Sequence, residues 1–108
     1  MFYTFVQNNS GGGFSVNVPA GISHYVIVEA RDAVTANMLA QDLGIYFNGV
    51  SKGYDCDCCG DRWYVAYDSD GTELPEIYDS HPSEVPSMWT KAGEGCCVHY
   101  LDGRMEWF

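Results

Sequence analysis

The stretch that decides the fold runs from Ile22 to Gly44 and reads ISHYVIVEARDAVTANMLAQDLG. Its first part, Ile22 to Ala30, is largely apolar on both faces, which is typical of a central strand covered on both sides. Asp32 is a preferred helix N-cap, Gly44 is a residue type that ends helices, and the residues between them predict a helix over 33–43. Apolar side chains recur there at the spacing of one buried helix face. They are Ala33, Ala36, Leu39, Ala40 and Leu43.

Shorter apolar segments on both sides of this stretch predict further strands. They are residues 2–7, 14–18, 45–47, 62–67 and 74–78. Asp102-Gly103 is a two-residue hairpin signal and predicts a turn between strands at 97–101 and 104–108. We therefore expect one α+β domain over residues 1–108, with one helix packed on a mostly antiparallel sheet of about five to six strands.

The charge of the chain is strongly negative. Its 108 residues include 5 Lys and Arg against 15 Asp and Glu, which gives a formal net charge of −10. This sign argues against unaided binding to nucleic-acid phosphates or anionic membranes, because both need a positive partner. We expect no direct nucleic-acid partner and no membrane contact. An aromatic share of 15% indicates a packed core rather than a disordered chain.

The first residues, Met1 to Gln7, do not have the features of a secretion signal. They carry no basic region, and their apolar run is short. No apolar stretch of the chain approaches the roughly 20 residues that span a bilayer. We therefore expect a soluble protein that works in the cytoplasm.

Five cysteines, an odd number, lie in two groups. In a reducing cytoplasm such clusters indicate metal binding or redox chemistry more than disulfides. Cys56 and Cys59 have the spacing with which two thiolates reach one tetrahedral ion, and Gly60 lets the turn fold back. Cys96 and His99 repeat that spacing with an imidazole. We predict one structural zinc ion held by Cys56, Cys59, Cys96 and His99, with Cys58 and Cys97 as alternates.

The zinc prediction depends on the local structure around His99. In a regular strand Cys96 and His99 point to opposite faces, so both ligate one ion only if the strand begins late or bulges. Alternatively, the cysteines are small turn or core residues that pack as apolar groups. A redox CxxC motif belongs at a helix N-terminus, whereas a glycine, an aspartate and a predicted strand follow here.

No catalytic constellation is recognisable in the chain. It lacks a serine-centred elbow and a paired-carboxylate motif, and its three histidines are far apart in sequence. Asp68 and Asp70 have the spacing of a calcium loop without its glycine and glutamate. The glycines at 11–13 lack the lysine and hydroxyl of a phosphate-binding loop. A cysteine and a histidine that meet only in space remain an alternative. We predict a non-enzymatic protein with no catalytic residues.

Acidic charge is concentrated in residues 63–90, which hold six carboxylates and no Lys or Arg. Aromatic residues are interleaved with these acids. Carboxylates steer a basic protein partner toward a surface, and Tyr and Trp anchor it there. The alternative is a solvated acidic face that keeps a small protein soluble. The residues predicted to bind a partner are Asp68, Asp70, Glu73, Glu76, Tyr67, Tyr78 and Trp89.

Three segments carry a resemblance to known proteins. They are MFYTF at 1–5 with QNNSGG at 7–12, the stretch from Leu39 to GIYFNGV at 44–50, and DCDCCGDRW at 55–63, and HYLDG at 99–103 is similar too. Over most of its length the chain resembles a family of small, largely uncharacterised proteins of tailed bacteriophages. The resemblance implies the host cytoplasm as the workplace, where small accessory phage proteins often inhibit host or defence proteins. It implies no catalytic residues, and the Cys96-Cys97 pair is not typical of the family.

We therefore expect a non-enzymatic protein that binds, and inhibits, a host or defence macromolecule through an acidic aromatic face. A second hypothesis is a small-molecule binder or sponge for a nucleotide-like ligand, which would use Arg31, Lys52, Arg62 and the backbone of the glycine-rich loop. A zinc-stabilised structural module is a third hypothesis, and an enzyme that uses the cysteine block is a fourth.

Overall fold

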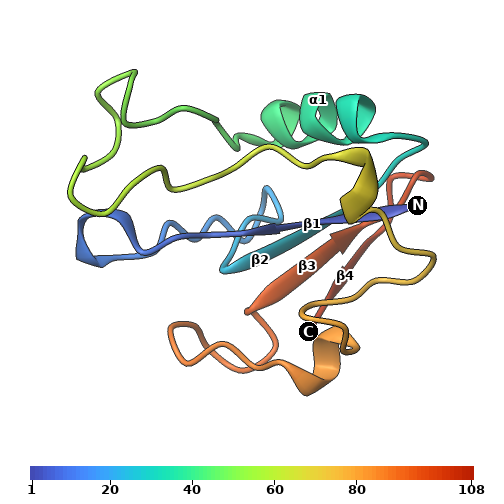
Figure 1. Cartoon of the computed structure of the whole chain (residues 1–108). Helices are drawn as coiled ribbons and strands as arrows, with labels where there is room; N and C mark the ends of the chain where they lie inside the picture. Colours follow the sequence, from blue (N-terminus) through green and yellow to red (C-terminus); the bar gives the residue numbers. More distant parts are fainter.

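One four-stranded sheet and one α-helix make up most of the regular structure in the computed structural model, which describes all residues 1–108 (Figure 1). The strands are β1 (Phe2–Val6), β2 (Tyr25–Glu29), β3 (Cys96–His99) and β4 (Met105–Trp107). The helix, α1 (Ala33–Leu43), follows β2. Short 3₁₀ turns occur at Ser10–Gly12, Asp68–Asp70 and Pro82–Glu84. The structure contains no helix with the length and apolarity that crossing a membrane requires.

The sheet is mixed, in the order β1-β2-β3-β4. β1 and β2 are antiparallel with Phe2 opposite Glu29, whereas β2 and β3 are parallel with Tyr25 opposite Cys96. β3 and β4 are again antiparallel, and the predicted hairpin at Asp102-Gly103 joins them. The α+β class is thus confirmed, but the expectation of about five to six mostly antiparallel strands is wrong. The parallel pair is the buried centre of the sheet, as parallel strands usually are.

Helix α1 begins and ends where the sequence predicts. The Asp32 carboxylate accepts a hydrogen bond from the Thr35 N–H at 2.8 Å, as an N-cap residue does. A second aspartate, Asp68, accepts from the Ala33 N–H at 2.9 Å. Gly44 has φ 117°, a left-handed conformation that suits glycine at a helix end. Local capping chemistry therefore fixes both ends of the helix.

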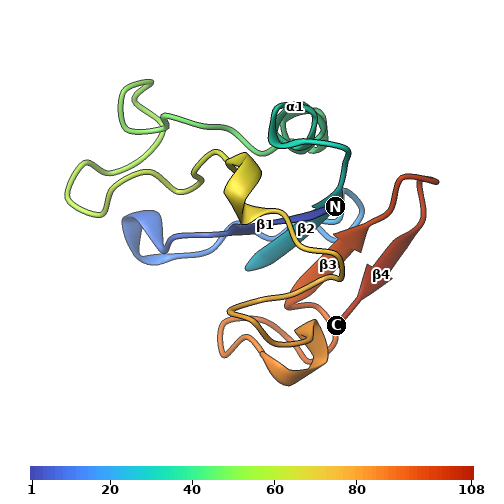
Figure 2. The same ribbon diagram turned by 45° about the vertical axis from the view of Figure 1, so that its right-hand side comes forward.

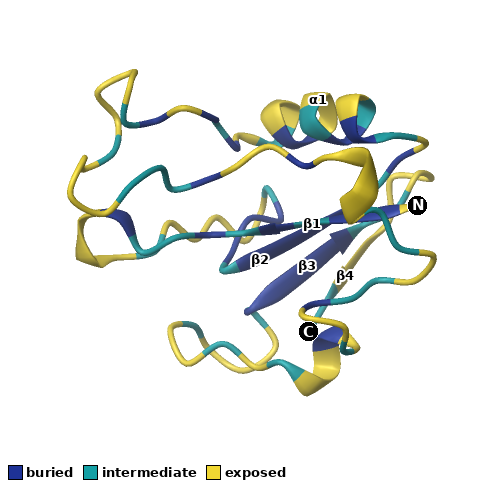
Figure 3. Cartoon of the chain, in the orientation of Figure 1, coloured by how far each residue is buried: buried dark blue, intermediate teal, exposed yellow.

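The buried face of α1 consists of alanines. Ala33, Ala36 and Ala40 are buried, whereas Leu39 is 36% exposed and Leu43 is only partly buried (Figure 3). The predicted stripe is therefore correct at its alanines and wrong for Leu39. Small side chains let the helix lie close to the sheet, and the larger leucines are left at the rim of the contact.

Two hydrophobic cores lie on opposite faces of the sheet. Figure 2 shows α1 on one side of the sheet and the segment with the 3₁₀ turn Pro82–Glu84 on the other. The first lies between α1 and the sheet and includes Tyr3, Phe5, Val26, Val28 and Trp63. The second lies on the other face and consists of Phe2, Tyr25, Ile27, Ile77, Cys96 and Val98. Neighbouring strand residues alternate between the cores, which explains why β2 is apolar on both faces.

A side chain replaces the strand partner expected for residues 62–67. The Asn37 amide nitrogen donates to the Ala66 carbonyl at 3.0 Å, and the Asn37 amide oxygen accepts from the Ala66 N–H at 2.8 Å. Trp63 and Ala66 are buried in the first core. The prediction of a strand is wrong here because a side chain satisfies the backbone that a neighbouring strand would have satisfied.

Three further segments predicted as strands are not strands in the structure: residues 14–18, 45–47 and 74–78. The backbone of Ser15 hydrogen-bonds the side-chain amide of Gln7, which is again a side chain in place of a strand. The Ile45 N–H still bonds the Ala40 carbonyl at 3.0 Å and belongs to the end of the helix. Tyr78 has φ 51°, a left-handed conformation that breaks an extended segment.

Candidate functional site

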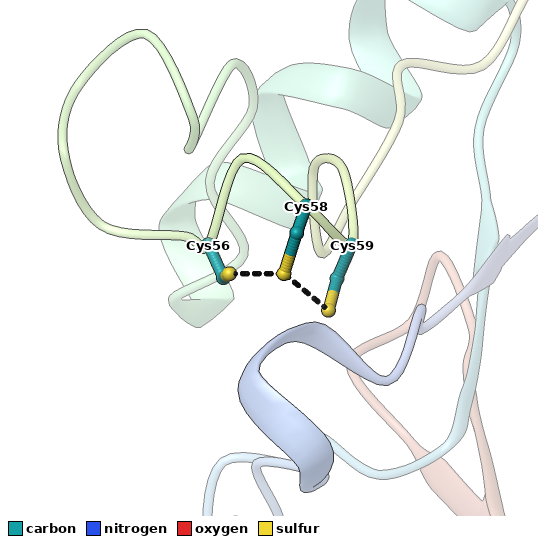
Figure 4. A group of neighbouring side chains, drawn as sticks. All are labelled: Cys56, Cys58 and Cys59. Atoms are coloured by element: carbon teal, nitrogen blue, oxygen red, sulfur yellow. Dashed lines mark hydrogen bonds between the residues drawn. The ribbon is translucent and has the colours of Figure 1, made fainter.

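Three cysteine thiols converge on the surface loop that follows Asp55 (Figure 4). The Cys56 and Cys58 sulfurs are 2.6 Å apart, and the Cys58 and Cys59 sulfurs are 3.5 Å apart. The ligand atoms of the three residues lie within 4.8 Å of one another, so the group could hold a metal ion. Cys58, predicted only as an alternate ligand, lies between the two cysteines of the CxxC pair.

The carboxylate of Asp55 fixes the start of this loop. Its side chain is 0% exposed. The Tyr46 hydroxyl donates to Oδ1 at 2.6 Å, and the Arg62 backbone N–H donates to Oδ2 at 2.8 Å. Gly49 lies so close that a Cβ there would collide with the carboxylate. A buried charge persists only with such partners, so these contacts hold the loop in one place.

The guanidinium of Arg62 ties the cysteine loop to the glycine-rich loop. Nη1 donates to the Gln7 side-chain oxygen at 2.8 Å and to the Gly13 carbonyl at 2.9 Å. Nη2 donates to the Ser10 carbonyl at 2.9 Å, and Nε to the Tyr46 hydroxyl at 3.2 Å. Every nitrogen of the group is engaged within the chain. Arg62 is therefore not free to bind an anion, as the hypothesis of a nucleotide-like ligand requires.

The backbone between the cysteines forms a tight turn. The N–H groups of Cys59 and Gly60 both donate to the Cys56 carbonyl at 3.2 Å. Gly60 has φ 84°, a conformation that glycine adopts without strain. The Asn8 side-chain amide donates to the Cys59 carbonyl at 2.7 Å and holds the far end of the turn. The turn predicted from the CxxCG spacing therefore forms.

The thiols of the cluster differ in acidity. The Cys58 thiol and then its backbone N–H donate to the Cys56 sulfur, which lowers the pKa of Cys56. The hydrogen bonds of the Cys58 thiol with the Cys56 and Cys59 sulfurs hold its proton in place and raise the pKa of Cys58 to about 12. Cys56 therefore deprotonates before Cys58. The thiolate is both the metal ligand and the nucleophile of cysteine, so Cys56 is the most reactive thiol of this pair.

The metal chemistry of the cluster follows from its donors. Soft thiolates select Zn²⁺ and Cu⁺ over hard cations such as Mg²⁺. A structural zinc site has four ligands, so three thiolates leave one tetrahedral position for water or an outside group. The buried carboxylate of Asp55 is committed to Tyr46 and Arg62 and does not belong to the cluster.

The structure does not bring the other predicted zinc ligands to this loop. Cys96 and Cys97 are buried in β3, with exposures of 1% and 0%. The side chain of His99 reaches the Gly21 carbonyl, 2.8 Å from Nε2. Burial raises the pKa of Cys96 and that of Cys97 to about 12, which keeps both thiols protonated. The alternation of a regular strand separates Cys96 from His99.

Part of the predicted partner-binding set lines one groove. Asp70, Glu76 and Tyr78 border a cavity of about 290 Å³ beside β1, together with Asp79. None of these three carboxylates forms a salt bridge within the chain. Tyr78 is 71% exposed. We call this cavity the acidic groove. Its charge is uncompensated, and its aromatic wall faces solvent.

Three other members of the set lie outside the groove lining. Asp68 accepts a hydrogen bond from the Ala33 N–H and so caps α1. The Tyr67 side chain is 66% exposed, and its backbone N–H donates to the Asp70 carboxylate at 2.8 Å. Glu73 is exposed and forms no salt bridge. Asp68 therefore has a structural role, whereas Tyr67 and Glu73 border the groove residues along the chain.

Trp89, the last member, is linked to the groove by a row of aromatic rings. It stacks on Phe14 with ring centroids 5.3 Å apart, and Phe14 contacts His24 at 4.7 Å. His24 stacks on Tyr25 at 4.0 Å, and Tyr25 meets Tyr78 edge to face at 6.3 Å. Tyr25 is only 6% exposed, so the row passes through the interior and links the exposed rings of Trp89 and Tyr78.

The largest cavity of the structure was not predicted from the sequence. It measures about 530 Å³ and lies between α1 and the β3–β4 hairpin. Apolar side chains such as Leu101 and Met105 line it, together with the carboxylates of Glu29 and Asp42. These carboxylates disfavour an anionic ligand. Its lining comes from elements far apart in the chain, so no local motif signals it.

These features define the molecule as a small α+β protein with a surface three-thiol loop and an acidic groove. The chain belongs to the family described as a domain of unknown function (DUF7296), whose model matches residues 1–108. No curated protein and no solved structure matches the chain. The family description names no activity, and a fold alone does not define one.

Proposed function

We propose that the protein is a non-enzymatic binding module that captures a basic protein partner at the acidic groove. The observation that carries this proposal is the set of three carboxylates, Asp70, Glu76 and Asp79, that line one groove without a cationic partner in the chain. Uncompensated carboxylates steer and select a basic surface, and Tyr78 offers an exposed aromatic anchor beside them. Following the resemblance to phage proteins, we propose that the partner is a host or defence protein, which the binding inhibits.

A pair of matched variants tests this function. Glu76→Gln with Asp79→Asn removes two charges from the groove, and asparagine tolerates the left-handed backbone of Asp79. The control, Asp42→Asn with Glu84→Gln, removes two exposed acids outside the groove lining. The unmodified chain and both variants are immobilised, and the proteins that each captures from bacterial lysate are quantified by mass spectrometry.

The expected result is a basic protein retained by the unmodified chain and by the control and reduced at least about tenfold by the groove variant. Its capture should also weaken as salt is raised, because screening acts on exposed charges. Equal capture by all three proteins would exclude the groove as the binding surface.

A second candidate function is favoured by the thiol geometry. We propose that Cys56, Cys58 and Cys59 bind one Zn²⁺ ion, because their three ligand atoms lie within 4.8 Å of one another on a loop that Asp55 and Arg62 hold in place. Metal analysis of protein purified without chelators tests this. About one equivalent of zinc is expected, lost in Cys58→Ser and kept in the control Cys97→Ser. Less than about half an equivalent in the unmodified protein would leave the thiols without a zinc role.

A further inference from the structure

The outer edge of β1 carries backbone groups that the sheet does not use. In an antiparallel pair, every second residue directs its N–H and C=O to the neighbouring strand, and the others direct theirs outward. The Gln7 N–H donates to the carbonyl of His24, the residue just before β2. By the same alternation, the odd-numbered residues of β1 direct their backbone N–H and C=O groups toward β2. The even-numbered residues, among them Thr4 and Val6, therefore direct their backbone groups away from the sheet.

This outer edge forms backbone hydrogen bonds only at its two ends. At one end Phe2 exchanges two hydrogen bonds with Thr72, at 2.7 and 2.9 Å. At the other end the Asn8 N–H donates to the Arg62 carbonyl at 2.8 Å. Between them neither Thr4 nor Val6 has a backbone partner across the edge. The gap is a short length of strand edge, half-buried, whose backbone groups have no partner in the chain. Such unpaired edges serve elsewhere as templates for another strand.

The acidic groove lies along this gap. Its lining includes Thr4 and Val6 as well as the three carboxylates and Tyr78. The Thr4 hydroxyl donates to the Glu76 carbonyl at 2.7 Å, which fixes one wall of the groove against the strand. Unused backbone donors and acceptors, uncompensated negative charge and an exposed aromatic ring therefore meet in one cavity of about 290 Å³.

We propose that the protein binds an extended basic segment of its partner as an added strand on β1, paired with Thr4 and Val6. This rests on the proposed function and names how the same groove recognises its ligand. Main-chain hydrogen bonds to the open edge supply register, and side chains that alternate along the bound segment reach the groove wall. Lysine or arginine at those positions meets Asp70, Glu76 and Asp79.

The charge of the chain selects this occupant over a second copy of the same protein. Two β1 edges that paired would bring two acidic grooves together, and each chain carries a net charge of −10. Like charges placed face to face oppose association. A basic strand removes the same repulsion and fits a gap that is only a few residues long. The bound segment is therefore short, and its affinity depends strongly on charge.

Amide hydrogen exchange of the whole protein, read by NMR, tests the proposal. The probe is a short peptide of alternating lysine and valine, and its matched control replaces the valines by prolines, which keeps the charge and removes backbone donors. The peptide is expected to slow exchange at the Thr4 and Val6 N–H groups by at least about tenfold. The N–H groups of Tyr3 and Phe5 already bond β2 and should stay protected with or without peptide.

The outcomes separate this proposal from the function on which it rests. Protection confined to Thr4 and Val6, weaker for the proline peptide, supports strand addition. Equal binding of both peptides without protection overturns strand addition and leaves a groove that binds basic proteins through side chains alone. No binding of either peptide overturns strand addition, and the function itself then depends on the groove variants described above. Self-association of the free chain with protection at these two amides would assign the edge to a second copy instead.

Discussion

His24 is the residue whose protonation the fold opposes most directly. Its ring lies between those of Phe14 and Tyr25, with centroids at 4.7 and 4.0 Å. Its Nδ1 lies 2.8 Å from the Ser87 hydroxyl. Partial burial lowers the pKa of His24 below its ordinary value of 6.5. The fold therefore favours the neutral imidazole, because burial removes the water that would stabilise its charged form.

Stability is expected to fall as the pH drops below about 6.5. The unfolded chain takes up the His24 proton near that pH, whereas the folded chain resists it, so protons favour unfolding in this window. Urea unfolding at about pH 7.5 and about pH 5.5 measures the loss. His24→Phe keeps the stacking and should reduce the difference, whereas the control His81→Asn should not. An unchanged difference in His24→Phe would show that another group causes it.

At the scale of the element, the loop from Asp55 to Arg62 owes its shape to hydrogen-bonding groups outside it, two of them side chains and one the Ser10 backbone carbonyl. Gln7, Ser10 and Tyr46 receive or relay the hydrogen bonds of the guanidinium. The geometry of the three thiols therefore depends on a buried ion pair, with Arg62 Nε 3.8 Å from Asp55 Oδ1. The cysteine loop and the glycine-rich loop form one structural unit.

Breaking this unit is expected to release the thiols. Arg62→Ala leaves the buried Asp55 without its cation and should lower the free energy of unfolding by about 3 kcal/mol or more. Arg62→Lys should recover only part of it, because an ammonium cannot form the planar fork. Chemical denaturation measures the free energy of unfolding. The rate at which Cys56 is alkylated measures how far the loop from Asp55 to Arg62 has lost its ordered structure. Arg104→Ala, which breaks an exposed ion pair, serves as the control. An equal loss of stability in this control would contradict a structural role specific to Arg62.

The elements that were predicted correctly are those whose signals are local. Asp32 and Gly44 bound α1 at its observed ends, and Asp102-Gly103 marks the observed hairpin. The strand predicted at 62–67 failed because Asn37, on a helix far away in sequence, takes the place of a neighbouring strand. No pattern within 62–67 carries that information.

The candidate sites follow the same rule. The thiol cluster is contiguous in sequence, and Cys56 and Cys59, predicted to share a site, lie in one group that could hold a metal ion. Cys96 and His99 were assigned to it on spacing alone, and strand alternation places them elsewhere. The acidic groove was partly predictable from its local charge. The open edge at Thr4 and Val6 was not, because it depends on which strands pair.

At the scale of the whole molecule, the net charge has a clear spatial pattern. Three of the five basic residues, Arg31, Arg62 and Arg104, lie in ion pairs with aspartates. Little positive charge remains to offset the acidic groove, where no ion pair forms. Three carboxylates without an ion pair therefore lie together beside the strand edge at Thr4 and Val6. This arrangement favours fast capture of basic partners at low salt.

The parallel pairing of β2 with β3 affects how the protein folds during and after its synthesis. Tyr25 pairs with Cys96, so the two central strands meet only after the long segment between them has been made. Such distant pairing slows folding, and refolding on a timescale of milliseconds to seconds is expected in stopped-flow experiments. Refolding in microseconds would contradict this.

Until β3 arrives, β2 is an exposed apolar strand with one free side. A ribosome that stalls before Cys96 leaves that side open, and the unfinished chain then requires either a chaperone or rapid proteolysis to avoid aggregation. Residues synthesised long after β2 are thus the ones that cover its free side and protect the chain from aggregation.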